Sequence, residues 1–145
     1  MKLATDAGAA DLRLSPWRAV YFGAREDAGV FVLEEARDAG LIVEENDPVL
    51  QVEACPGAPD CKSSSVDARG DARRLATIAA VHGYQGSIHV SGCAKGCARS
   101  LPSDLVLAGK AGAYRLIRKA TTRGPVERMI GADEFEALFR GTRDD

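Results

Sequence analysis

The spacing of apolar residues in the first third of the chain predicts two short strands and a helix. Residues 12–22 read as a strand, a turn marked by Pro16 and a second strand that is rich in aromatic residues. Residues 27–39 then place alanine and valine at helical spacing, with charged residues between them. Gly40 follows directly and suits the C-terminal cap of that helix.

The remaining two thirds of the chain predict strands that alternate with helices. Apolar and polar residues alternate over 50–54, which predicts a strand running straight into Cys55. Ser64 and Asp67 have the spacing of a capping box, so we expect a helix from there to about His82. Further strands are expected at 87–90, 104–108 and 113–118, and a final helix at 132–140.

This order of elements predicts an α+β fold, a mixed α/β sheet with helices packed on it. The 145 residues suffice for one compact domain and part of another, and a hydrophobic content of 46% is typical of globular proteins. No run of about 18 apolar residues occurs, so we expect no membrane span. The first residues lack the apolar run of a signal peptide, and we therefore expect a cytoplasmic protein.

Charge is distributed unevenly along the chain. Residues 1–60 carry 5 Lys and Arg against 12 Asp and Glu, whereas residues 61–145 carry 14 against 9. The net charges of −7 and +5 give the second part a surface suited to a polyanionic ligand. Nucleic acid is not the expected ligand, because the chain has neither a helix-turn-helix nor an aromatic RNA-binding motif.

All four cysteines fall into two pairs at the ends of predicted strands. Cys55 and Cys61 enclose five residues, and Cys93 and Cys97 enclose three, with 31 residues between the pairs. Both pairs stand in segments rich in glycine and proline, whose backbones can approach a cofactor closely. Four thiolates that converge from such loops are the ligands of a [4Fe–4S] cluster, which is the interpretation we favour.

Three other interpretations of the cysteines remain open. Structural zinc usually takes cysteines two to four residues apart, so the first pair fits it poorly. Disulfides are rare in the cytoplasm, where paired cysteines more often bind metal or carry out redox chemistry. Four separate core thiols are the remaining interpretation, and pairing at strand ends argues against them.

The segments around the cysteines resemble the siroheme and [4Fe–4S] domain of the nitrite/sulfite reductase superfamily. These are Ala54-Cys55-Pro56-Gly57-Ala58-Pro59-Asp60-Cys61 and Ile88-His89-Val90-Ser91-Gly92-Cys93-Ala94-Lys95-Gly96-Cys97-Ala98. Within the superfamily they are most similar to the precorrin-3B synthase branch, since the reductases more often have Pro-Asn in place of Ala94-Lys95. The segment Leu12-Arg13-Leu14-Ser15-Pro16-Trp17-Arg18 is similar to the end of the family's ferredoxin-like half-domain.

The resemblance implies a domain organisation and a function. Residues 12–46 would be part of the ferredoxin-like half-domain and residues 47–140 the [4Fe–4S] domain, between flexible ends at 1–11 and 141–145. The function implied is that of an oxidoreductase half, a precorrin-3B synthase-like monooxygenase of aerobic cobalamin biosynthesis that acts on a tetrapyrrole. The alternatives are a fragment of a siroheme-dependent nitrite or sulfite reductase and a non-catalytic cluster- or zinc-binding module.

The resemblance also implies cofactors and partners. The cofactor would be a [4Fe–4S] cluster, and if siroheme is also bound, Cys97 would bridge the two. Family members are built from two pseudo-symmetric halves, so a second chain could supply the half that is missing. Electrons would come from a donor protein, because no nucleotide-binding glycine motif is present.

Four basic residues are candidates for contacts with the carboxylates of a macrocycle. Lys95 and Arg99 flank the last cysteine, and Arg13 and Arg18 lie in the first predicted strand pair. His89 is expected on the polar face of its strand, opposite its two apolar neighbours, rather than as an iron ligand. Catalytic residues are not identified by any pattern in the sequence.

Overall fold

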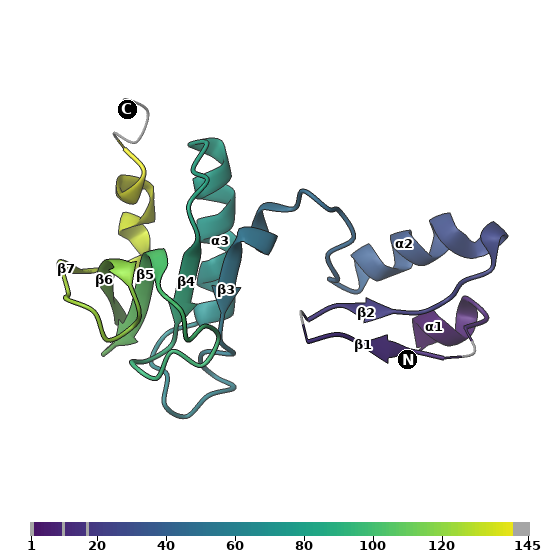
Figure 1. The fold of residues 1–145 in the computed structure, drawn as a ribbon, viewed down its shortest axis with the longest axis horizontal. Helices are drawn as coiled ribbons and strands as arrows, with labels where there is room; N and C mark the ends of the chain where they lie inside the picture. The colour runs from purple at the N-terminus through teal and green to yellow at the C-terminus, as the bar shows by residue number, and fades with distance from the viewer. Residues whose placement is uncertain (1, 10, 17, 141–145) are drawn as a thin grey trace. The chain divides into compact units, whose positions relative to one another are not determined.

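The structure, a computed structural model of the chain, describes residues 2–9, 11–16 and 18–140. The chain divides into two compact units, Met1–Asp47 and Pro48–Asp145. Figure 1 shows the elements of each unit. The flexible end expected at 141–145 lies outside the described residues.

The first unit contains a small strand pair and two helices. Strands β1 (Arg13–Leu14) and β2 (Val20–Tyr21) pair antiparallel, as the sequence predicts. A 3-10 turn, η1 (Glu26–Ala28), leads into helix α2 (Gly29–Asp38), which buries Val32 and Ala36. Gly40 has a φ of 78° and donates its N–H to the carbonyl of Arg37, which confirms its role in ending the helix.

The N-terminal segment differs from the flexible end expected for residues 1–11. Lys2–Asp6 form a short helix, α1, and Ala7 after it is completely buried. Ala7 packs with Ala28 and Val32, and Leu3 and Phe22 border this small core. Burial of these side chains stabilises the segment, which a composition of small residues does not reveal.

The second unit is built on a sheet of five strands. In spatial order they are β3 (Val52–Ala54), β4 (Ile88–Ser91), β5 (Ser103–Lys110), β6 (Ala113–Ala120) and β7 (Arg128–Ile130). The first three strands run parallel and the last three antiparallel, so the predicted mixed sheet is confirmed. The edge strand β7 was not predicted, because two of its three residues are exposed and show no alternation.

One face of this sheet carries the main core. Helix α3 (Ala68–Val81) connects β3 to β4 and lies along the sheet (Figure 1). It buries Ala72, Leu75 and Ala76 against side chains such as Val90 and Leu107. The predicted C-terminal helix is the 3-10 helix η3 (Ala132–Leu138), and it adds Phe135 and Leu138 to the same core.

Two elements begin later than the sequence predicts. Pro48–Gln51 form the 3-10 turn η2, so the strand expected over 50–54 is reduced to Val52–Ala54. Asp67, not Ser64, caps α3, since its carboxylate accepts the N–H of Gly70 at 3.0 Å. The Ser64 hydroxyl instead donates to the carbonyl of Val66 at 2.8 Å, within the loop that precedes the helix.

Candidate functional site

The two cysteine pairs follow neighbouring parallel strands at the same end of the sheet. Ala54, the last residue of β3, lies opposite Val90 in β4. Cys55 therefore leaves the sheet beside the point where Cys93 leaves it, and both loops lie below that end in Figure 1. The sequence predicts each pair at a strand end, and the structure adds that the two strands are parallel neighbours.

A hydrogen bond to sulfur joins the two loops. The backbone N–H of Gly92 donates to Sγ of Cys55 at 3.1 Å, and the contact is buried. Cys55 is itself buried, whereas Cys61 and Cys93 are half-buried and Cys97 is exposed. An amide that points at a cysteine sulfur is the kind of contact that tunes an iron–sulfur cluster.

Glycines allow the two loops to pack against each other. A Cβ on Gly92 would stand 2.2 Å from Oγ of Ser64 and 3.4 Å from Cα of Gly57. Lys95 adds a polar contact between the loops, because its Nζ donates to Oγ of Ser63 at 3.1 Å. The glycines of these loops thus serve loop-to-loop packing, and their close approach to a cofactor stays a prediction.

The four cysteines do not form a closed metal site in this arrangement. Over the described ranges, no three His, Cys, Asp or Glu side chains lie close enough together to hold a metal ion. Their chemistry nevertheless fits an iron–sulfur cluster: the loops share one end of the sheet, an amide faces the sulfur of Cys55, and glycines let the two loops approach each other there. The ligand set itself stays a prediction.

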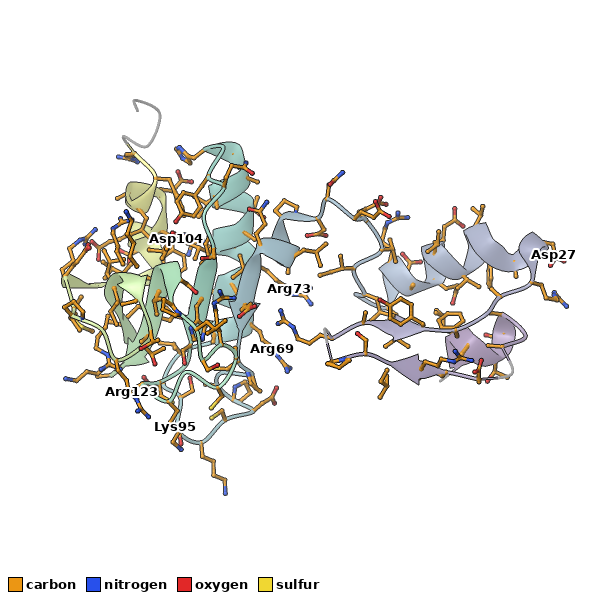
Figure 2. All side chains as sticks on the ribbon, viewed as in Figure 1. Asp27, Arg69, Arg73, Lys95, Asp104 and Arg123 are labelled. Atoms are coloured by element: carbon orange, nitrogen blue, oxygen red, sulfur yellow. The ribbon has the colours of Figure 1, made fainter. Side chains whose placement is uncertain are left out.

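Two of the four basic residues singled out in the sequence line one pocket beside the second cysteine loop. Its volume is about 350 Å³, and its lining residues are Lys95, Gly96, Arg99, Ser100, Thr121, Thr122 and Arg123. Figure 2 places Lys95 and Arg123 at the same end of the second unit. The sequence missed Arg123, because nothing in its turn between strands indicates that it meets the cysteine loop.

Arg13 and Arg18 belong to the first unit. Arg13 is exposed on β1 and pairs with Asp11 at 3.0 Å. Arg18 is exposed in the turn between β1 and β2, with a φ of 60°. Their contact with a macrocycle stays a prediction.

His89 lies on the sheet face opposite the main core, as expected, but that face is not polar. The side chain is completely buried, and neither ring nitrogen has a hydrogen-bond partner among the described residues. Burial lowers its pKa, Glu53 raises it and Arg99 lowers it again. The expectation of a solvated polar face is therefore wrong, because apolar residues such as Val106 and Ile117 also occupy that face.

We predict that stability falls as the pH drops below about 6.5, the usual pKa of histidine in an unfolded chain. The lowered pKa keeps His89 neutral in the folded protein, so only the unfolded state gains its proton, which favours unfolding. Urea unfolding between about pH 7.5 and pH 5.5 should show this loss, and His89→Asn should reduce it. His82→Asn is the control. If the free energy of unfolding of His89→Asn depends on pH as strongly as that of the wild type, the loss does not come from His89.

Comparison with known proteins finds a similar sequence and a similar fold. The chain is 34% identical over 120 residues to a precorrin-3B synthase from a Sinorhizobium species, a match that takes in 81% of this chain. Its fold is similar to that of the NirA protein of Mycobacterium tuberculosis, with a TM-score of 0.68 over 94% of this chain at 16% sequence identity. No protein-family model matches the chain.

The comparisons also show how much of each relative the chain represents. It spans 26% of the length of the Sinorhizobium protein and 30% of the NirA chain. The mixed α/β fold is similar to that of NirA, so the predicted fold class is confirmed. None of the described helices is both long and apolar enough to cross a membrane. The chain is thus similar in sequence to part of a precorrin-3B synthase and in fold to part of NirA.

Proposed function

We propose that the chain holds a [4Fe–4S] cluster through Cys55, Cys61, Cys93 and Cys97. The single observation that carries this proposal is the buried N–H of Gly92, which donates to Sγ of Cys55 across the two cysteine loops. A backbone amide that donates to a cysteine sulfur is the kind of contact that supports a cluster ligand. When bound, the cluster would supply one-electron transfer.

The residues around the cysteines have separate roles in this proposal. The amide of Gly92 orients Cys55, and the bond from Lys95 to Ser63 keeps the second loop against the first. Lys95 also adds positive charge next to an anionic cluster, which raises its potential. Cys97 is the exposed cysteine of the four, so its sulfur is accessible to a second group such as siroheme.

The activity we propose is that of the cluster-bearing half of a precorrin-3B synthase-like oxidoreductase, acting on a tetrapyrrole in the cytoplasm. Sequence similarity to a precorrin-3B synthase supports this reaction over others. The chain spans about a quarter of that relative, so residues outside this sequence would supply the remaining part of the active site. An electron-donor protein would complete the system.

A siroheme-dependent nitrite or sulfite reductase half is the second candidate. The fold similarity to NirA, which extends over nearly the whole chain, favours it. Sequence identity is higher to the precorrin-3B synthase, which is why we place that function first.

Anaerobic purification followed by metal, sulfide and absorption measurements tests the proposal. We expect about four iron and four sulfide per chain and a broad absorption band at the blue end of the visible spectrum, because four thiolates suit a [4Fe–4S] cluster. An added Soret-type band would favour the siroheme-dependent candidate. Zinc without iron would reject both oxidoreductase functions and leave a zinc-binding module.

A further inference from the structure

An ion pair brackets the four cysteines along the chain. Nη1 of Arg99 donates to Oε1 of Glu53 at 3.1 Å, although the two residues stand 46 positions apart. Glu53 belongs to β3 and precedes Cys55 by two residues, while Arg99 follows Cys97 by two residues. The contact therefore joins the strand that enters the first cysteine loop to the segment that leaves the second.

Further hydrogen bonds fix the position of Arg99. Its Nε donates to the carbonyl of Pro102 at 3.2 Å, and its backbone N–H donates to the carbonyl of Gly96 at 3.3 Å. Two separate N–H groups of the guanidinium thus have acceptors on different segments. Because the guanidinium is planar and rigid, the bond to Pro102 also orients the group that reaches Glu53.

The pair is better shielded from water than exposed ion pairs of the molecule. The side chain of Arg99 is 27% exposed and that of Glu53 31%. The side chains of Arg13 and Asp11, by comparison, are 79% and 59% exposed. Exposed pairs contribute little because water and salt screen them, whereas a shielded pair is screened less. The bond between Arg99 and Glu53 should therefore have a measurable effect.

The surroundings of the pair disfavour a lone charge. Glu53 lies opposite His89 in the register of β3 and β4, so the two side chains share one face of the sheet. Burial lowers the pKa of His89, and the charges of Glu53 and Arg99 act on it in opposite directions, which places both charges near the buried ring. Each of them balances the other at the border of this buried face, and removal of one would leave its partner uncompensated.

The position of Cys97 depends on the segment that carries Arg99. Ala98 packs against the main core, and Arg99 is attached to β3 through Glu53. Two consecutive residues therefore anchor the chain directly after Cys97, one by apolar contact and one by charge. Cys97 is the exposed cysteine, so burial of its own side chain does not hold it in place.

We propose that Arg99 is a positioning residue, which holds Cys97 beside the first cysteine loop through its ion pair with Glu53. The ion pair rests on the structure alone, whereas the cluster that the cysteines would share rests on the proposed function. This role needs no ligand in the pocket that Arg99 also lines. Residues that orient metal ligands without touching the metal typically change metal affinity about ten- to a hundredfold when they are replaced.

The test measures how fast an iron chelator removes iron from the full chain, purified anaerobically, with loss of the visible absorption as the readout. Arg99→Gln should lose iron about tenfold faster than the wild type. Glu53→Gln should match it, and the double variant should be no faster than either single one, because all three lack the same contact. Arg99→Lys, which can still pair with Glu53, should lie between Arg99→Gln and the wild type.

Arg118→Gln is the matched control. Arg118 pairs with Glu127 at 3.3 Å in the same unit, and it shares a sheet face with Leu116 of the main core, opposite the face of Glu53. Its variant should lose iron at the wild-type rate. Circular dichroism and urea unfolding of the iron-free forms check that each variant folds. If Arg99→Gln does not fold, Glu53→Gln and Arg99→Lys decide the test.

Opposite effects in the two single variants would overturn the positioning role. Arg99→Gln removes a positive charge near the cluster and Glu53→Gln a negative one, so a purely electrostatic influence would change the rate in opposite directions. Wild-type rates in both variants would also overturn the role and would leave the proposed cluster standing. A wild-type chain that holds no iron would overturn the proposed function and this role with it.

Discussion

Replacement of Cys61 by serine is expected to reduce bound iron to less than about a tenth of the wild-type amount after anaerobic purification, because the cluster needs every thiolate ligand. Serine keeps the size of the side chain but presents a hydroxyl that is not ionised at neutral pH. Cys61 is only half-buried, so its loss should leave the sheet and α3 intact. Iron and sulfide analysis together with the absorption spectrum measures the effect.

The matched control for this variant is Ser63→Ala in the same loop. Ser63 is exposed and accepts a hydrogen bond from Lys95, so its hydroxyl contributes to the contact between the loops but supplies no ligand. Ser63→Ala should retain most of the iron, and both variants should keep the circular dichroism of the wild type. Full iron content in Cys61→Ser would remove this residue from the ligand set.

Most elements of the second unit could be predicted because their patterns are local. The helix from Ala68 to Val81 has a strong helical period and a capping residue within four positions of its predicted start. Strands β3 and β4 on either side of it alternate apolar and polar residues, and β5 holds a continuous apolar run. Strand β7 could not be predicted, since its three residues belong to the sheet only through pairing with β6. Helix α1 likewise depends on packing against α2, a contact that no local pattern encodes.

In the candidate site, too, some features follow from local sequence patterns and others depend on tertiary contacts. The two cysteine pairs stand out by their spacing, and the position of both loops at one end of the sheet follows from parallel strands in adjacent positions. Their binding of one cluster stays a prediction. Arg123 could not be predicted, because its turn is held at the pocket by a tertiary contact. That contact is the hydrogen bond from the Thr122 hydroxyl to the Ala94 carbonyl, which joins residues far apart in the sequence. His89 was placed on the correct face, but the burial of that face depends on β5 and β6. Alternation gives the side of a sheet, and only the tertiary structure decides what covers that side.

Gly57 is the residue in the cysteine loops where a side chain would be least tolerated. Its φ is 71°, a conformation that costs other residues about 1–2 kcal/mol. A Cβ there would also stand 2.4 Å from the backbone nitrogen of Ala68, the first residue of α3. Ala68 is completely buried, so neither partner can move aside without disturbing the core. The carbonyl of Gly57 accepts the N–H of Cys61 at 2.7 Å, which couples this packing to the position of a cysteine.

Gly57→Ala is therefore expected to lower the free energy of unfolding by about 3 kcal/mol, from the backbone conformation and the overpacking together. It should also lower the iron content, because the loop that carries Cys61 must shift away from α3. Urea unfolding followed by circular dichroism measures the first effect, and iron analysis the second. Gly83→Ala is the matched control: its φ is 67° but no atom lies within 4 Å of the added Cβ, so it should lose only about 1 kcal/mol and keep its iron. Equal losses in the two variants would show that the close approach to Ala68 contributes nothing, and that the loop is positioned by the backbone conformation alone.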